Sequence, residues 1–313
     1  MNNPDACWDV VVIGAGPAGL TAALYLARYR RKVLVVHDGK SRALRIPMTH
    51  NAPGFPEAIS GSDLVERMTR HVAEHGAPIE KAGITNIDRS AAGFRIKSAD
   101  GREWEGRALI LASGILLNQV DLAHEVHEAA ISAGVLRYCP ICDGYEHTNH
   151  RIGVIGCDSD GAAEALFLRQ YSSDITLMPL SHSELSEEQA AEMAKAGIVV
   201  KAGALTALEP HRDRMDVHLE GQNGSLSFDV IYPALGCRPR AELAEQIGIE
   251  LEEGGCVSAR SVRESGVPGF FAAGDVVEGL DQISVAMGHG AMAATSAHNW
   301  IRAQDRQTLQ SAS

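Results

Sequence analysis

The chain has 313 residues, enough for two compact domains of the usual size. Hydrophobic residues make up 45% of the chain and charged residues 22%, as in ordinary globular proteins. The formal net charge of −12 disfavours binding to nucleic acid or anionic membranes, since both are negatively charged. No apolar stretch approaches the roughly 18 residues of a membrane span. Residues 1–9 lack the basic start and apolar core of a signal peptide, so we expect a cytoplasmic protein.

Short apolar runs bounded by glycine alternate with helical stretches along the chain. Such runs suit parallel strands covered on both faces, and their alternation with helices predicts doubly wound α/β domains. The predicted strands are Val10–Ile13, Val33–Val36, Ala108–Ala112, Ile152–Ile155, Ile175–Met178, Val230–Leu235 and Phe270–Ala272. Residues 10–36 and 152–178 each form a complete βαβ unit, which predicts two nucleotide-binding folds.

The first βαβ unit carries a glycine-rich turn between its strand and its helix. The turn consists of Gly14, Ala15, Gly16, Pro17, Ala18 and Gly19. Its first glycine permits a tight turn, its second lets the backbone approach a pyrophosphate, and its third lets the helix pack on the strand. The helix N-terminus then holds the phosphates. An acidic residue after the second strand is expected to bind ribose hydroxyls, and Asp38 or its neighbour His37 is the candidate.

A cysteine pair lies between the two βαβ units. Two residues separate Cys139 from Cys142, which lets the sulfurs form a disulfide and exchange with another disulfide through a thiolate. In a reducing compartment, such a pair points to catalysis or metal binding. Asp143 offers a carboxylate for proton transfer. The alternative is zinc, because His147 and His150 follow, although their distance from the pair is shorter than in zinc fingers.

Taken in order, these landmarks and several others resemble those of the low-molecular-weight thioredoxin reductases. The others are Asn51-Ala52-Pro53-Gly54-Phe55, Ile59-Ser60-Gly61, Ala112-Ser113-Gly114 and Phe271-Ala272-Ala273-Gly274-Asp275. The resemblance implies a homodimer, and an FAD domain made from both ends of the chain with a second domain inserted. We therefore predict an FAD-binding domain at residues 1–117 and 241–313. The inserted domain at residues 118–240 would carry the cysteine pair, and both would be three-layer Rossmann-like ββα folds.

The resemblance also implies roles for matched residues. Cys142 would face the flavin, Cys139 would attack the substrate disulfide, and Asp143 would shuttle the proton. Asp275 would bind the ribityl–phosphate region, and a helix starting near Ala286 would point its N-terminus at the flavin pyrimidine ring. The other expected cofactor contacts are Asn51, Ala112, Gly114, Gly274, Gln282 and Ile283. The family has arginine before that glutamine and alanine after it, whereas this chain has Asp281 and Ile283.

The inserted domain departs from the family where its members bind NADPH. Its turn reads Gly156-Cys157-Asp158-Ser159-Asp160-Gly161, so Asp158 replaces the glycine that should approach a pyrophosphate. Two like charges about 4 Å apart repel by roughly 4 kcal/mol at an effective dielectric near 20. Residues 179–194 contain four glutamates and no lysine or arginine, whereas an NADPH site needs arginines for the 2′-phosphate. We therefore predict FAD as the cofactor and impaired binding of NADPH.

Several functions remain open at this point. The leading hypothesis is an FAD-dependent thiol–disulfide oxidoreductase that reduces a thioredoxin-like protein or a small disulfide, with ferredoxin or another donor in place of NADPH. A second is a dithiol oxidase that passes electrons from FAD to oxygen. The relatives of that kind carry histidine where this chain has Asp143. The others are an ordinary NADPH-dependent thioredoxin reductase with a drifted site, and a non-catalytic redox sensor.

Overall fold

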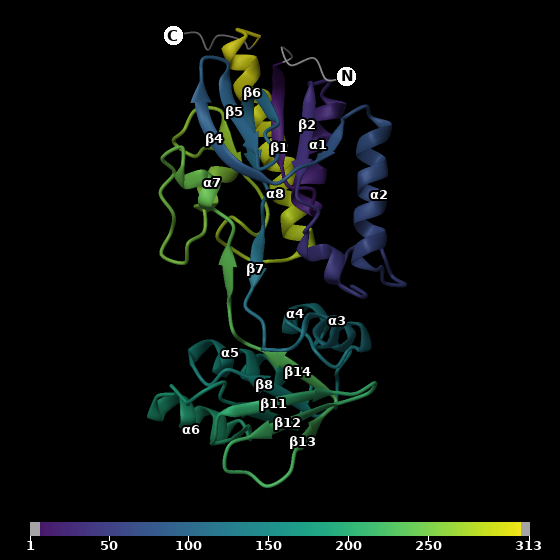
Figure 1. The fold of residues 1–313 in the computed structure, drawn as a ribbon, viewed down its shortest axis with the longest axis vertical. Helices are drawn as coiled ribbons and strands as arrows, with labels where there is room; N and C mark the ends of the chain where they lie inside the picture. The colour runs from purple at the N-terminus through teal and green to yellow at the C-terminus, as the bar shows by residue number, and fades with distance from the viewer. Residues whose placement is uncertain (1–6, 308–313) are drawn as a thin grey trace.

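The computed structural model describes residues 7–307 and consists of two lobes (Figure 1). The first strand, β1 (Trp8–Ile13), and the last helix, α8 (Ile283–Gln304), lie in the same lobe. The absence of a signal peptide was predicted partly from residues 1–6, which lie outside the described residues, as do residues 308–313. Within the described range, no helix has both the length and the hydrophobicity needed to cross a membrane.

The upper lobe is built on a seven-stranded sheet with the order β3-β2-β1-β6-β5-β4, in which β16 also pairs with β6. Besides β1, its strands are β2 (Val33–His37), β3 (Ile79–Lys81), β4 (Ile84–Ser90), β5 (Gly93–Ser98), β6 (Glu103–Leu111) and β16 (Phe270–Ala272). The long strand β6 belongs to two parts of this sheet. Gly106 pairs in parallel with Trp8 of β1 and antiparallel with Phe94 of β5. The parallel part therefore continues into an antiparallel meander of β4, β5 and β6.

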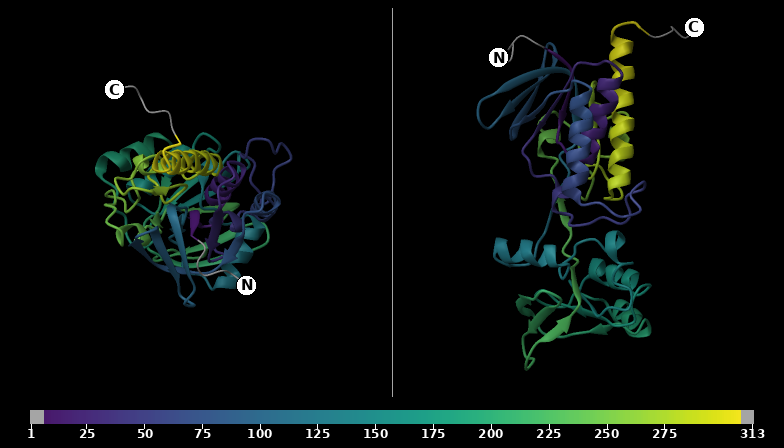
Figure 2. Two further views of the ribbon diagram at one scale, coloured as in Figure 1. Left: turned by 90° about the horizontal axis from the view of Figure 1, so that it is seen from above. Right: turned by 90° about the vertical axis from the view of Figure 1, so that its right-hand side faces the viewer.

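The meander covers one face of the parallel strands, and helices cover the opposite face (Figure 2). They are α1 (Pro17–Arg28), α2 (Gly61–Glu74) and α8, with the short elements η1 (Arg42–Arg45), α7 (Glu242–Glu245) and η2 (Ala259–Val262) in the loops. Helices α1 and α8 pack along one another because small residues line their contact. Ala293 and Ala297 are fully buried, and a Cβ on Gly290 would lie 2.2 Å from the carbonyl oxygen of Ala18.

The lower lobe repeats the three-layer plan. Its parallel sheet has the order β10-β9-β8-β14, with β8 (Ile152–Ile155), β9 (Ile175–Met178), β10 (Val199–Val200) and β14 (Val230–Pro233). A three-stranded antiparallel sheet contains β11 (Leu205–Pro210), β12 (Met215–Leu219) and β13 (Leu226–Phe228). Alternate side chains of β8 face opposite layers: Val154 packs with α5 (Ser159–Leu168) and α6 (Glu187–Lys195), and Ile155 with the antiparallel sheet and α3 (His124–Ala133).

Two short strands connect the lobes. They are β7 (Ile115–Leu117) and β15 (Cys237–Pro239), which pair antiparallel. Gly114 precedes β7 with φ +71° and Gly236 precedes β15 with φ +69°, left-handed conformations that glycine adopts without strain. We propose the domain boundaries 117/118 and 240/241 at the ends of these strands.

The predicted α/β class with two doubly wound Rossmann-like ββα units is confirmed, whereas several strand boundaries are wrong. The bounds of β8, β9 and β16 match the prediction. The first strand begins earlier, at Trp8, and the second ends later, at His37. The predicted strand Ala108–Ala112 misses the first half of β6, because that half alternates polar and apolar residues in the meander. The predicted strand Val230–Leu235 runs too far, because β14 ends at Pro233.

Candidate functional site

A cavity of about 530 Å³ runs from the first glycine turn to the cysteine pair. This volume lies in the range of cofactor and small-molecule sites. The predicted cofactor-binding residues that line it are Gly14, Gly16, Pro17, Ala18, His37, Asp38, Asn51, Ala112, Gly114, Gly274, Asp275, Gln282 and Ile283. The remaining one, Gly19, has the packing role expected of the third glycine, since a Cβ there would lie 1.9 Å from the carbonyl oxygen of Gly14.

The first glycine turn leaves the N-terminus of α1 open. Gly16 is the N-cap, and no side chain makes a capping hydrogen bond to it. Gly14 has φ +115°, and a Cβ there would lie 2.1 Å from the carbonyl oxygen of Ala112. The turn is therefore tight and bare, as binding of a pyrophosphate at a helix N-terminus requires.

Arg42, a cation outside the predicted site residues, also lines this cavity. Arg42 Nη1 is 3.2 Å from Asp275 Oδ2 and 3.8 Å from Asp281 Oδ2. Burial raises the pKa of Asp275 and raises that of Asp281 to about 6, and the charge of Arg42 opposes both increases. The arginine that the family carries beside its glutamine is absent here, but Arg42 places a positive charge nearby. The only sequence signal was a basic residue in the loop after the second strand.

Asp38 is ionised and held in place at the end of β2. Its oxygens accept hydrogen bonds from the Lys40 N–H at 2.9 Å and from Arg240 Nη2 at 2.5 Å. Burial alone would raise the pKa of Asp38, but these bonds outweigh burial and lower it. Burial lowers the pKa of neighbouring His37, which therefore favours its neutral form. Asp38 remains our candidate for binding ribose hydroxyls.

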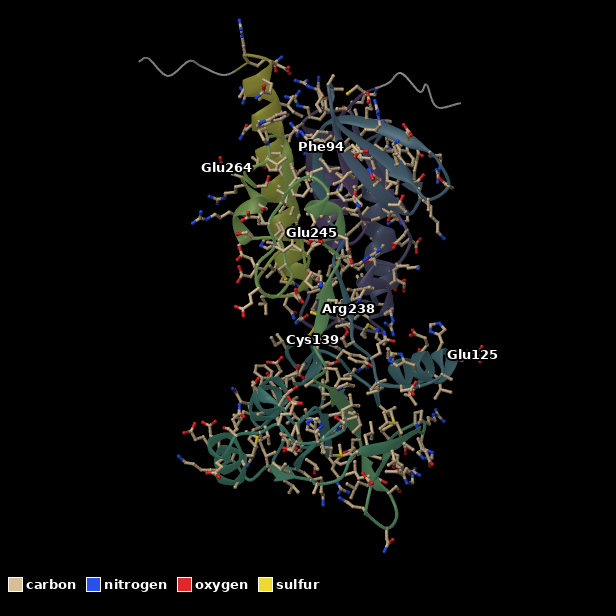
Figure 3. All side chains as sticks on the ribbon, turned by 60° about the vertical axis from the view of Figure 1, so that its left-hand side comes forward. Phe94, Glu125, Cys139, Arg238, Glu245 and Glu264 are labelled. Carbon is tan, nitrogen blue, oxygen red and sulfur yellow. A yellow bond between two sulfur atoms is a disulfide. The ribbon has the colours of Figure 1, made fainter. Side chains whose placement is uncertain are left out.

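The cysteine pair forms a disulfide between Cys139 and Cys142. Both residues line the cavity, and Cys139 lies at the junction of the lobes (Figure 3). Cys139 is the N-cap of the single-turn helix α4 (Pro140–Asp143), which places Cys142 one turn further along. The disulfide is incompatible with the zinc alternative, because both sulfurs are bonded to one another. His147 instead packs edge-on against Tyr232, with ring centroids 6.1 Å apart.

Two amide side chains of the upper lobe reach the cysteine turn. Gln282 Nε2 lies 3.4 Å from the sulfur of Cys139 and 3.5 Å from that of Cys142. Asn51 Nδ2 donates to Gln282 Oε1 at 3.0 Å and to the carbonyl oxygen of Ile141 at 3.3 Å. Gln282 was expected at the flavin, and in this structure its amide lies against the sulfurs.

The expectation that the last helix begins near Ala286 is wrong. Helix α8 begins at Ile283, and Gln282 is its N-cap with extended backbone angles. The Ala286 N–H makes a hydrogen bond of 2.9 Å to the carbonyl oxygen of Gln282, which closes the first turn. The positive end of this 22-residue helix therefore points toward the cysteine end of the cavity.

Asp143 is enclosed by groups from the lower lobe. Its Oδ1 accepts a hydrogen bond of 2.7 Å from the Tyr232 hydroxyl, and its Oδ2 lies 3.2 Å from Arg137 Nε. Burial raises the pKa of Asp143 to about 6, while Tyr232 and Arg137 act to lower it. A carboxyl with such a pKa can give and take protons near neutral pH. No sequence motif predicts the role of Tyr232, because it lies 89 residues after Asp143.

The second glycine turn keeps its backbone geometry but is closed by its own residues. Gly156 has φ +129°, and a Cβ on Gly161 would lie 1.7 Å from the carbonyl oxygen of Gly156. Asp158 is the N-cap of α5, and its Oδ1 accepts a hydrogen bond of 2.8 Å from the Gly161 N–H. The Glu184 N–H donates to the carbonyl oxygen of Cys157 at 2.6 Å. The helix terminus is thus capped, and the loop after β9 lies against the turn.

This turn is surrounded by carboxyl groups, and its one thiol is unreactive. Burial raises the pKa of Glu164 to about 7, and the charges of Asp160 and Asp158 add to the increase. Cys157 is 3% exposed, so its side chain is a small buried group of the turn. Burial raises the pKa of its thiol to about 11, so the thiolate is scarce at neutral pH.

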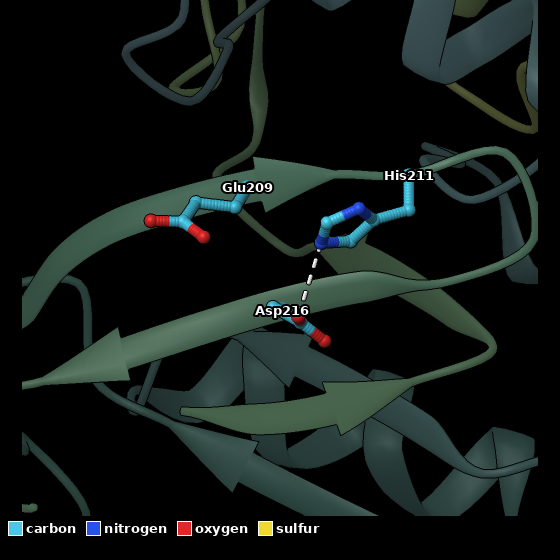
Figure 4. Close-up of side chains that lie close together, drawn as sticks. All are labelled: Glu209, His211 and Asp216. Carbon is cyan, nitrogen blue, oxygen red and sulfur yellow. Dashed lines mark hydrogen bonds and ion pairs between the residues drawn. The ribbon is translucent and has the colours of Figure 1, made fainter. Parts of the chain in front are cut away.

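A further group of potential metal ligands lies on the hairpin of β11 and β12. Glu209, His211 and Asp216 have ligand atoms within 4.8 Å of one another (Figure 4). The oxygens of Asp216 already accept hydrogen bonds from Ser227 at 2.5 Å and from Arg214 at 3.3 Å, and one lies 3.0 Å from His211 Nε2. Because Arg214 already neutralises this carboxylate, the group is a surface ion-pair network.

These features match a known family. Residues 8–290 match the family described as pyridine nucleotide-disulphide oxidoreductase. The chain belongs to this family. The thioredoxin reductase of Aquifex aeolicus is 30% identical over 96% of this chain and 95% of its own length. That of Bacillus subtilis is 27% identical over 94% of this chain and 95% of its own.

Solved structures agree with this assignment. The crystal structure of HlmI has a TM-score of 0.88 at 27% identity and covers 97% of this chain, with 95% of HlmI matched. The thioredoxin reductase of Streptococcus pyogenes MGAS5005 has a TM-score of 0.86 over 96% of this chain and 99% of its own, and its 22% identity supports the fold alone. The chain is therefore a thioredoxin reductase-like oxidoreductase, and its family implies FAD. The open turn, the ionised Asp38 and the continuous cavity fit that cofactor.

Proposed function

We propose that this enzyme passes electrons between FAD and the Cys139–Cys142 disulfide, and from there to a thioredoxin-like protein or a small disulfide. Bound FAD supplies the two-electron chemistry. Breaking the bond between the two sulfurs takes two electrons. Asp143 is the proposed donor of a proton to one of the two sulfurs. We assign Cys142 to the flavin side and Cys139 to attack on the substrate disulfide.

We also propose that nicotinamide cofactors are not its electron donors. The contrast between the two glycine turns carries this proposal. Gly16 leaves α1 uncapped, whereas the Asp158 carboxylate occupies the corresponding helix terminus of α5. A pyrophosphate there would displace a capping hydrogen bond and meet a negative charge, at a cost of roughly 4 kcal/mol for charges about 4 Å apart.

The loop after β9 adds a second obstacle. His182 Nε2 lies 3.2 Å from Glu184 Oε1, and the Glu184 N–H donates to the carbonyl oxygen of Cys157 beside the turn. This loop offers a carboxylate where a 2′-phosphate needs arginines. We propose reduced ferredoxin, or another protein carrier, as the donor, since such a carrier needs no dinucleotide site.

An anaerobic titration of the FAD-loaded enzyme tests the choice of donor. NADPH and NADH at micromolar concentration are expected to leave the flavin absorbance unchanged, because their pyrophosphate site is closed. Reduced ferredoxin is expected to bleach it and to release two titratable thiols. Rapid, full bleaching by micromolar NADPH would overturn the proposal and leave an ordinary NADPH-dependent reductase. Peroxide release from dithiols in air would instead indicate the dithiol oxidase.

We further propose that the enzyme is a cytoplasmic homodimer, as the resemblance implies. Apolar side chains on α1 and α8 are exposed in the single chain, among them Tyr25 at 40% and Met292 at 38%. A second chain would cover such a surface. Sedimentation of the FAD-loaded protein is expected to give twice the 33.4 kDa of one chain, and a monomer at micromolar concentration would contradict this.

A further inference from the structure

The two oxygens of Asp143 face two residues of the lower lobe, one in strand β14 and the other hydrogen-bonded to that strand through its backbone. Tyr232 lies in β14 and is fully buried, and its hydroxyl donates to Asp143 Oδ1 at 2.7 Å. A buried hydroxyl needs a hydrogen-bond partner, and among the described residues Asp143 is the one that Tyr232 has. The tyrosine ring packs in the core with α5 and α6, which fixes the position of the hydroxyl.

Arg137 is fastened to the same strand. Its backbone N–H donates to the carbonyl oxygen of Ile231 at 2.9 Å, and neighbouring Leu136 forms a bridge with Ile231. Arg137 Nε then lies 3.2 Å from Asp143 Oδ2. The strand therefore binds one carboxyl oxygen through the Tyr232 hydroxyl and places the charge of Arg137 beside the other, in an ion pair without a hydrogen bond from Nε.

We infer that Tyr232 and Arg137 are positioning residues, which hold the carboxyl of Asp143, the residue after Cys142, in the wall of the cavity that the Cys139–Cys142 disulfide also lines, for proton delivery. The inference rests on the proposed role of Asp143 and adds the two residues through which that role is exerted. Nothing in the local sequence pattern of the cysteine turn assigns them this function.

The proton is needed when the disulfide reacts with an external dithiol. A thiolate of the dithiol attacks the sulfur of Cys139, and the Cys139–Cys142 bond breaks with its electron pair on Cys142. The second thiolate of the dithiol then attacks the mixed disulfide. The sulfur of Cys139 leaves with the electron pair and takes the proton of Asp143, and the external dithiol departs as a disulfide. A carboxyl held in one orientation delivers this proton more often than a rotating one.

The charged groups around Asp143 determine the direction of the expected change. Burial raises its pKa to about 6, the Tyr232 hydrogen bond and the charge of Arg137 lower it, Glu146 raises it, and His50 lowers it. Glu146 follows α4 in the chain and His50 belongs to the upper lobe, and Glu146 Oε1 lies 3.7 Å from His50 Nδ1. Loss of the Tyr232 hydroxyl removes a stabiliser of the ionised form, so the pKa must rise and the carboxyl must stay protonated to higher pH.

The test is a pH titration of the FAD-loaded, oxidised enzyme by infrared difference spectroscopy. The band of the protonated Asp143 carboxyl is identified by its loss in Asp143→Asn. Tyr232→Phe keeps the ring and is expected to raise the midpoint by about one pH unit, as for one lost hydrogen bond to an ionised group. Arg137→Met is expected to raise it less, and Arg137→Lys to restore it in part.

Tyr171→Phe is the matched control. Tyr171 also packs beside α4, since a Cβ on Gly144 would lie 2.9 Å from its ring, and its hydroxyl makes no hydrogen bond to the described residues. This change is expected to leave the midpoint unchanged. A midpoint that is also unchanged in Tyr232→Phe and Arg137→Met would overturn the inference. Should Tyr232→Phe fail to fold, the two Arg137 variants decide the matter.

Exchange with dithiothreitol gives a second readout. The rate at which dithiothreitol reduces the Cys139–Cys142 disulfide is measured by trapping the free thiols. We expect this rate to be about tenfold lower in Tyr232→Phe at a pH below the midpoint of the Asp143 titration, where Asp143 is protonated in both proteins. An equal rate in both proteins would overturn the positioning role. The proposed function fails separately, if dithiothreitol reduces the disulfide of the unaltered enzyme but leaves its flavin absorbance unchanged.

Discussion

Gly16 and Asp158 occupy the same place in two copies of one turn, and the difference between their side chains decides what each helix can bind. The glycine leaves backbone N–H groups available, while the carboxylate accepts the Gly161 N–H at 2.8 Å and fills the terminus with negative charge. The Asp158 carboxylate thus occupies the place at the helix N-terminus where an anion would otherwise bind.

Exchanging these two residues tests that interpretation. Asp158→Gly removes the charge at a small cost in capping, a few tenths of a kcal/mol. Its affinity for NADH should therefore rise by up to about a thousandfold, the equivalent of roughly 4 kcal/mol. Gly16→Asp should produce a folded protein without bound FAD, because its carboxylate would close α1 in the same way. Calorimetric titration with NADH and the visible absorbance of the purified proteins measure the two effects.

Unchanged NADH affinity in Asp158→Gly would show that the loop carrying Glu184 closes the site by itself. Full retention of FAD in Gly16→Asp would show that the carboxylate can turn away from a helix terminus. Either result would contradict the claim that the charge of the Asp158 carboxylate prevents nicotinamide cofactors from binding.

At the level of elements, the sequence predicts the central parallel strands and both glycine turns well, because continuous apolar runs and left-handed glycines leave few alternatives. It does not predict the short parallel edge strands β3 and β10. It does not predict the two antiparallel meanders. In β4 and β11, exposed residues such as Thr85 and Glu209 interrupt the more buried ones without strict alternation, a pattern that a solvated loop shares. The start of α8 was also missed, because Gln282 is not one of the usual N-cap residues.

Contacts between distant elements explain the rest of what the sequence could not predict. Tyr232 meets Asp143 because β14 lies beside β8 and below α4, an arrangement that no local pattern encodes. Arg42 likewise reaches Asp275 from an element 233 residues away in sequence. The two candidate nucleophiles, Cys139 and Cys142, can be predicted from their spacing in the sequence. Tyr232 and Arg42, which contact the neighbouring carboxyl groups, can be found only in the folded structure.

At the scale of the whole molecule, contacts between the lobes hold the disulfide against the cavity that begins at the first glycine turn. Arg45 of the upper lobe lies 2.6 Å from Glu128 Oε1 and 3.1 Å from His127 Nδ1 in the lower lobe. Asn51 adds a hydrogen bond of 3.3 Å to the carbonyl oxygen of Ile141, between the two cysteines. The cofactor site and the redox pair therefore form one continuous space, which is the basis of the proposed electron transfer.

That continuity is tested most directly by adding dithiothreitol to the FAD-loaded enzyme without oxygen and recording the flavin absorbance. The disulfide should be reduced first and the flavin then bleached, because Cys142 lines the same cavity as the first glycine turn. Cys142→Ser, which keeps FAD but has no second sulfur, should remain unbleached over the same time. Equal bleaching of the two proteins, or none in the unaltered enzyme, would contradict electron exchange between FAD and the cysteine pair.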